Sequence, residues 1–124
     1  MKIRGIDHVA LYTDRFEETI RFFRDVFDAE DLGTFQAKEK GCWLAVGDSV
    51  LEIFDSVPSE DGWFQHIAVG TDDVDALFAR ALDHGAAPLE EPKDIRMELK
   101  KPMDARIAFV RGINGEQIEL FCRR

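Results

Sequence analysis

The sequence predicts an α+β fold in which two βαβββ modules form a cupped mixed sheet with helices on its outer face. Three observations predict it. The string IDHVALYTD at 6–14 returns as FQHIAVGTD at 64–72, 58 positions further on. The string SVLEIF at 49–54 returns as EQIELF at 116–121. Apolar residues at helical spacing follow each copy of the first string, so strand and helix patterns occur in the same order twice.

Length and charge limit the classes of protein to consider. The chain has 124 residues and a formal net charge of −9. We expect one domain over 1–124, with module one at about 3–56 and module two at about 63–122. The negative charge disfavours nucleic acid and anionic membrane surfaces as partners. No apolar run approaches the roughly 20 residues of a membrane span, and no apolar signal core follows the first residues, which predicts a cytoplasmic protein.

Module one reads as strand, helix and three strands. Alternating apolar residues predict a strand at 3–12, and the apolar stripe from Phe16 to Phe27 predicts an amphipathic helix. Short runs separated by glycines predict strands at 33–38, 42–46 and 49–54.

Module two repeats this order. A strand is expected at 66–70 and a helix from Val74 to Leu82, followed by strands near 94–100, 105–110 and 116–122.

Acidic residues and a glycine mark the helix ends. Asp14 is expected to cap the first helix and Asp72 the second, because a carboxylate accepts hydrogen bonds from free backbone N–H groups there. Gly85 is expected to end the second helix in a left-handed conformation.

Four ionisable residues lie at matched places on the strands. Successive strand residues point to opposite faces, so each of the four points away from the aliphatic face of its strand. Any one of them alone is more often a hydrogen-bonded or solvated residue than a ligand. Together, one His and one Glu in each copy predict a shared metal site made of His8, Glu52, His66 and Glu119.

The strings DHVAL, VLEIF, QHIAV and QIELF also carry a resemblance that covers the chain from Ile6 to Phe121. The chain resembles the vicinal oxygen chelate superfamily of glyoxalases, bleomycin-resistance proteins and dioxygenases. The resemblance implies a divalent ion held by His8, Glu52, His66 and Glu119, with open positions for substrate. It also implies a homodimer, with the site completed within one chain or across the dimer.

The complete ligand set is most similar to that of glyoxalase I (lactoylglutathione lyase). That resemblance implies a metal-dependent lyase or isomerase that transfers a proton through a metal-stabilised enediolate of a small oxygen-chelating substrate. Glu119 is the first choice for the catalytic base and Glu52 the second. The alternatives are an epimerase or extradiol-type dioxygenase of the same superfamily, or a non-catalytic small-molecule-binding or resistance protein.

The metal and the substrate remain open in the sequence. Two imidazoles and two carboxylates with open positions suit an octahedral nickel, cobalt, manganese or zinc ion. The resemblance to glyoxalase I favours zinc or nickel among these, with cobalt, manganese or iron as alternatives. Cys42 and Cys122 are expected to be reduced and to take no part in a disulfide framework. Tyr12 stands where glutathione-using glyoxalases carry an Arg, which leaves the use of glutathione undecided. A locally basic group could steer an anionic substrate, although solvated surface cations are more usual: Arg96, Lys100, Lys101 and Arg106.

Overall fold

A computed structural model of the protein describes residues 1–58, 62, 64–112 and 115–124. The chain divides into two compact units. The module-one unit consists of residues 8–65 and 98–102, and the module-two unit of residues 1–7, 66–97 and 103–124. Position 63, the predicted start of module two, lies outside the described residues. The organisation of residues 1–124 as a single domain stays a prediction.

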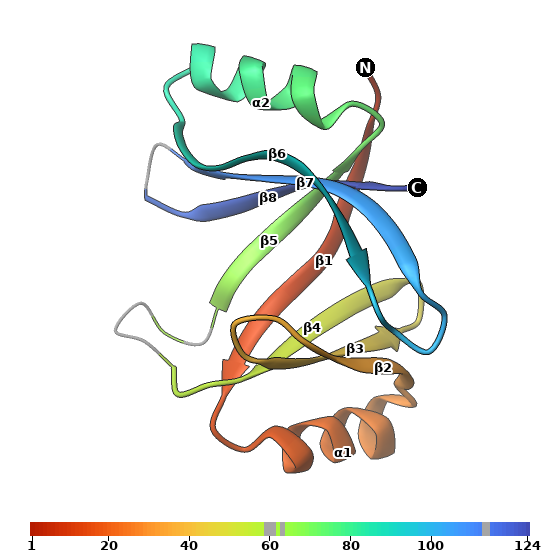
Figure 1. The fold of residues 1–124 in the computed structure, drawn as a ribbon. Helices are drawn as coiled ribbons and strands as arrows, with labels where there is room; N and C mark the ends of the chain where they lie inside the picture. The colour runs from red at the N-terminus through yellow and green to blue at the C-terminus, as the bar shows by residue number, and fades with distance from the viewer. Residues whose placement is uncertain (59–61, 63, 113–114) are drawn as a thin grey trace. The chain divides into compact units, whose positions relative to one another are not determined.

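The module-one unit has the predicted βαβββ order (Figure 1). Its strands lie in the order β2-β3-β4-β1, with β1 parallel to β4 and the other neighbours antiparallel. The predicted start of β2 at residue 33 is wrong by three residues, because the strand already begins at an exposed acidic residue. The elements are β1 (Ile3–Thr13, of which residues 8–13 belong here), α1 (Phe16–Phe27), β2 (Glu30–Gln36), β3 (Lys40–Val46) and β4 (Ser49–Asp55).

The module-two unit repeats the order and also takes in the first residues of β1. Lys2 donates its N–H to the carboxylate of Asp72 at 2.6 Å and accepts the N–H of Asp72 at 3.0 Å, so the start of β1 lies beside β5. β5 runs parallel to β8, and β8, β7 and β6 follow as antiparallel neighbours. The elements are β5 (Phe64–Thr71), α2 (Val74–Asp83), β6 (Ala87–Met97), β7 (Met103–Arg111) and β8 (Gln117–Arg123).

Each helix covers one face of the sheet in its own unit (Figure 1). The buried side of α1 brings Phe16 and Ile20 against Leu44 and Ile53. The α2 core is made in the same way, with Val74 packed against Ala108, Leu120 and their neighbours. Burying several aliphatic and aromatic side chains in this way stabilises each unit by roughly 1.5–3 kcal/mol per side chain. Both helices therefore lie on the aliphatic face of the strands, as the alternation predicts.

The two predicted helix caps are wrong by one residue. Arg15, not Asp14, is the N-cap of α1, and its N–H is accepted by the hydroxyl of Thr13 at 3.0 Å. Asp73, not Asp72, is the N-cap of α2, where its carboxylate accepts the N–H of Ala76 at 3.0 Å. In both cases the strand continues one residue further toward the helix than the sequence pattern indicates. Gly85 does follow α2 with a positive φ of 101°, as expected.

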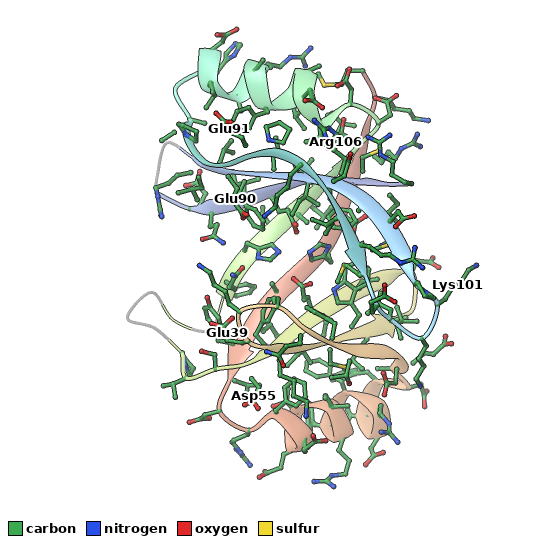
Figure 2. All side chains as sticks on the ribbon, in the orientation of Figure 1. Glu39, Asp55, Glu90, Glu91, Lys101 and Arg106 are labelled. Atoms are coloured by element: carbon green, nitrogen blue, oxygen red, sulfur yellow. The ribbon has the colours of Figure 1, made fainter. Side chains whose placement is uncertain are left out.

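Residues 98–102, which connect β6 to β7, belong to the module-one unit and pack there against β2. Lys100 donates its N–H to the carbonyl of Leu32 at 3.0 Å. Gly33 has a φ of 127°, and a Cβ there would lie 2.7 Å from the backbone nitrogen of Lys100. Only glycine fits this contact, both in conformation and in space. Figure 2 shows Lys101 at the tip of the hairpin that β6 and β7 form.

β6 runs from Ala87 to Met97. It is therefore longer than the strand predicted near 94–100, and it begins and ends earlier. Register shifts interrupt its pairing with β7 between Pro88 and Glu90 and again between Glu90 and Lys93. These irregularities and the proline hide the first half of the strand in the sequence, and an edge strand tolerates both. Among the described residues, neither helix has the length and apolarity needed to cross a membrane.

Candidate metal centre

The first His–Glu pair lies on adjacent parallel strands of the module-one unit. His8 comes from β1 and Glu52 from β4, where the register places Glu52 opposite Ala10. The Nε2 atom of His8 lies 3.5 Å from Oε1 of Glu52. Only 2% of His8 and 6% of Glu52 is exposed. A buried carboxylate beside a buried imidazole is costly unless it is neutralised or ligated, so this pair is unlike an ordinary solvated surface pair.

Trp43 completes this pair from the neighbouring strand. It lies opposite Glu52 on β3, and its indole N–H donates to Oε2 of Glu52 at 2.7 Å. Its ring centroid lies 5.0 Å from that of His8. Sequence reasoning did not assign Trp43 to the site, because an aromatic residue on a strand is most often a core residue. The signal that would have found it is the cross-strand register, which depends on the length of the β3–β4 turn.

The second His–Glu pair repeats this arrangement in the module-two unit. His66 comes from β5 and Glu119 from β8, opposite Ala68. The Nε2 atom of His66 lies 3.0 Å from Oε1 of Glu119, and 4% and 5% of the two residues is exposed. Phe109 lies opposite Glu119 on β7, with its ring centroid 5.2 Å from that of His66. The structure therefore places the candidate histidine and glutamate of each module close together.

The side chains on the other face of these strands are apolar, as the alternation predicts. Ile53 is fully buried next to Glu52 and belongs to the α1 core. Leu120 is 3% exposed next to Glu119 and belongs to the α2 core. Each helix thus holds its strand on one face while the ionisable residue occupies the opposite face. This packing explains how the ionisable side chains are buried without entering the apolar core.

Cys42 is separated from His8 and Glu52 in the same way. It is a free thiol that lies on the α1 side of β3, beside the core residues of the module-one unit. Burial, together with the negative charge of Asp31, raises the pKa of Cys42 to about 12. A thiol that stays protonated at neutral pH is a poor metal ligand. The second cysteine, Cys122, is also free and partly buried.

The basic residues near the end of the second module are largely paired with acids. Arg106, labelled in Figure 2, donates to Asp75 on α2 at 2.6 and 2.9 Å and to Asp94 on β6 at 3.1 Å. These hydrogen bonds raise the pKa of Arg106 and lower that of Asp75. Arg96 pairs with Asp104 at 3.1 Å. These arginines therefore link β7 to α2 and to β6 by ion pairs. This role weakens the expectation that they attract an anionic substrate.

Comparison with known proteins places this arrangement in a family. Residues 5–120 match the model of the Glyoxalase/Bleomycin resistance protein/Dioxygenase superfamily. A search of curated protein sequences gives no match.

Solved structures share the fold at low sequence identity. A variant of methylmalonyl-CoA epimerase from Streptomyces coelicolor, in complex with 2-nitronate-propionyl-CoA, is 23% identical, with 98% of each chain covered and a TM-score of 0.79. Methylmalonyl-CoA epimerase from Mycobacterium tuberculosis is 20% identical, with 98% of this chain and 89% of that chain covered and a TM-score of 0.76. A mutant of 4-hydroxymandelate synthase from Streptomyces coelicolor is 19% identical, with 96% of this chain and 48% of that chain covered and a TM-score of 0.72.

The family match and the two βαβββ modules agree with each other. They confirm the α+β class and the vicinal oxygen chelate fold predicted from the sequence. The particular resemblance to glyoxalase I stays a prediction, as do the ligand roles of the four ionisable residues. With its family model matched over nearly the whole length, the chain belongs to the Glyoxalase/Bleomycin resistance protein/Dioxygenase superfamily.

Proposed function

We propose that the protein is a metal-dependent enzyme that removes and returns a proton at a carbon next to a carbonyl group of a small molecule. The observation that carries the proposal is the duplicated, buried His–Glu pair, in which a carboxylate oxygen lies 3.5 Å or 3.0 Å from an imidazole nitrogen. In the proposal, His8, Glu52, His66 and Glu119 hold one divalent ion between them.

The chemistry of the donors supports a metal of this kind. Two imidazoles and two carboxylates match the preferences of zinc or nickel, and cobalt, manganese and iron accept the same ligands. All four side chains are buried, so the cost of removing the carboxylate charges from water favours a bound cation. Four protein ligands leave coordination positions open in an octahedral site. When bound, the ion would polarise the oxygens of a substrate and make the neighbouring C–H group more acidic.

The carboxylates would carry the proton. Glu119 is the proposed base, which takes the proton from the carbon next to the carbonyl group and, in an isomerisation, returns it to the adjacent carbon. Glu52 is the second choice for this step. The imidazoles of His8 and His66 have no part in the proton transfer in this scheme and serve to hold the ion.

Two reactions begin with this step and differ in where a proton is then added. Epimerisation adds a proton to the opposite face of the same carbon, so it uses a second donor on that face, such as a water molecule, while Glu119 keeps the proton that it removed. The similarity in fold to the methylmalonyl-CoA epimerases favours a CoA thioester as substrate. Isomerisation of the glyoxalase I type returns the removed proton to the adjacent carbon, and Glu52 favours this reaction because it completes the ligand set of glyoxalase I. We place the epimerase first.

Solvent exchange distinguishes these reactions and tests the proposal. The metal-loaded protein is incubated in D₂O with methylmalonyl-CoA and, separately, with the hemithioacetal of methylglyoxal and glutathione, and proton NMR follows the C–H signal. Exchange at the α-carbon of the thioester supports the epimerase, and conversion of the hemithioacetal supports the isomerase. Glu119→Gln is the matched control.

Elemental analysis of protein purified without chelator or affinity metal tests the site itself. About one divalent ion per site is expected, and His66→Ala should lose it. If no added divalent ion binds to the wild type, the enzyme proposal is wrong, and a non-catalytic small-molecule-binding protein becomes the better account. The homodimer stays a prediction, which light scattering of the metal-free and loaded protein would check.

A further inference from the structure

We propose that Trp43 is a positioning residue that fixes the carboxylate of Glu52 as a ligand of the site. The inference rests on the proposed function and deepens it, because it concerns how one ligand of the same site is held in orientation. Its starting point is the 2.7 Å hydrogen bond from the indole N–H of Trp43 to Oε2 of Glu52.

This hydrogen bond is well placed to hold the carboxylate. Trp43 is 1% exposed, so its N–H has no access to water and depends on a protein acceptor. A bond from an N–H to an ionised carboxylate is roughly twice as strong as one between neutral groups. With Oε2 held by the indole, rotation of the carboxylate is restricted, and Oε1 is the oxygen that lies 3.5 Å from Nε2 of His8.

Module two has an aromatic residue at the matching position but without a donor. Phe109 faces Glu119 across the β7–β8 pair, as Trp43 faces Glu52 across the β3–β4 pair. The two rings also lie at similar distances from the histidine of their own module, 5.2 Å and 5.0 Å between centroids. A phenyl ring has no N–H group, so Phe109 cannot orient Glu119 as Trp43 orients Glu52.

The hydrogen bond from Trp43 suits Glu52 to the task of a steady ligand. A ligand benefits from a fixed orientation, since hydrogen bonds from outside the ligand set orient the ligands and tune affinity for the ion. Phe109, which offers no such hydrogen bond, provides the comparison within the same protein.

The hydrogen bond itself is tested in the metal-free protein by NMR of the ¹⁵N-labelled indole groups. The chain has two tryptophans, so the indole signal that remains in Trp63→Phe belongs to Trp43. In Glu52→Gln this signal should move upfield, because an amide oxygen is a weaker acceptor than a carboxylate oxygen, whereas Glu119→Gln should leave it in place. A Trp43 signal that is the same in wild type and Glu52→Gln would overturn the inference, and this holds even if Trp43→Phe fails to fold.

The effect on the ion is tested by competition with a chromophoric chelator, with Co²⁺ as the probe. Trp43→Phe should weaken Co²⁺ binding by about 10- to 100-fold, the usual effect of removing a hydrogen bond to a ligand. It should also change the visible absorption of the bound Co²⁺. Phe109→Leu is the matched control, which removes the ring of module two and no hydrogen bond to a ligand, and it should leave the affinity unchanged within error.

A double-mutant cycle separates positioning from packing. In a Glu52→Ala background, Trp43→Phe should cause no further loss of Co²⁺ affinity, since the group on which it acts is gone. An equal loss in both backgrounds would mean that Trp43 acts through packing alone and would overturn the inference. If wild type binds Co²⁺ and Trp43→Phe binds it as tightly, only the inference fails. If wild type binds no divalent ion, the proposed function itself fails.

Discussion

The two modules share the parts that place the histidine and the glutamate and differ in how each helix is fastened. In both, the strand that carries the histidine ends in a threonine whose hydroxyl accepts the N–H two residues later, Thr13 from Arg15 at 3.0 Å and Thr71 from Asp73 at 3.1 Å. In module two an ion pair then joins the helix to its sheet, between Asp75 and Arg106.

Module one has a looser ion pair at the corresponding place, between Lys40 on β3 and Glu17 on α1 at 3.8 Å. Lys40 also lies over the ring of Phe16, 5.1 Å from its centroid, at the start of α1. The turn between strand and helix and an acid at the second helical residue therefore occur in both modules, whereas the basic partner and its geometry differ. The lesson is that the geometry at the histidine constrains the residues more than the attachment of the helix does.

The largest expected effect compares the two glutamates. Glu119→Gln should lower the rate of proton transfer by about 10²–10⁴-fold, the usual contribution of a general base, and added metal should not restore it. Glu52→Gln should instead weaken binding of the ion and recover much of its rate when the ion is saturating. Rate measurements across a metal titration, by the D₂O exchange assay, distinguish the two. The reverse pattern would make Glu52 the base.

The second prediction compares the two cysteines. Because the pKa of Cys42 is raised to about 12, alkylation by iodoacetamide at pH 8 should be at least about 100-fold slower in the folded protein than in urea. Cys122, which is partly exposed, should be alkylated first. Mass spectrometry of time points gives both rates. Rapid modification of Cys42 in the native state would show that the α1 core opens more readily than its packing implies.

The third prediction compares two glycines with positive φ. Gly33→Ala should lower the free energy of unfolding by about 2–4 kcal/mol, because the new methyl group would be strained and would also meet the backbone of Lys100. Gly5→Ala is the matched control, with a φ of 101° and open space around the added carbon, and should cost about 1–2 kcal/mol. Urea unfolding measures both. Equal losses would mean that the backbone at Lys100 shifts away from the new methyl group without lowering the free energy of unfolding.

The smallest effect concerns the ion pair of module two. The pKa of Asp75 is lowered by its hydrogen bonds from Arg106, so the folded state gains stability above the ordinary pKa of an aspartate. This gain is lost as the pH falls through the lowered pKa. Asp75→Asn should therefore lower Tm slightly at pH 7, since the pair is exposed, and should match wild type in strong acid. Scanning calorimetry at several pH values checks this.

Much of the fold and of the site could be predicted because both follow from local patterns. The alternation around His8 and Glu119 identified their strands and faces, and the apolar stripe from Phe16 to Phe27 gave the bounds of α1. Duplication doubled each signal, since a match between two copies is less ambiguous than one string alone. The choice of one histidine and one glutamate in each module as candidate ligands followed from this repetition.

What could not be predicted depends on contacts between strands that are distant in the sequence or on single backbone angles. Trp43 entered the site through its register with Glu52, which the order of residues does not fix. The helix caps were misplaced by one residue because Arg15 and Asp73 are set by where each strand ends. The start of β6 was missed because Pro88 and the register shifts break the alternation.

The division of β1 between the two units has a consequence for how the chain folds during synthesis. Residues 1–7 belong to the module-two unit, where Asp7 accepts two hydrogen bonds from Arg123, 116 positions away, at 2.9 and 3.1 Å. On the ribosome, the start of β1 can pair with the end of β5 once Asp72 has been made, but Asp7 gains its ion pair only after Arg123 has followed. Module one can form its local contacts early, whereas the contact between Asp7 and Arg123 forms late, because closing so long a loop carries a large entropic cost.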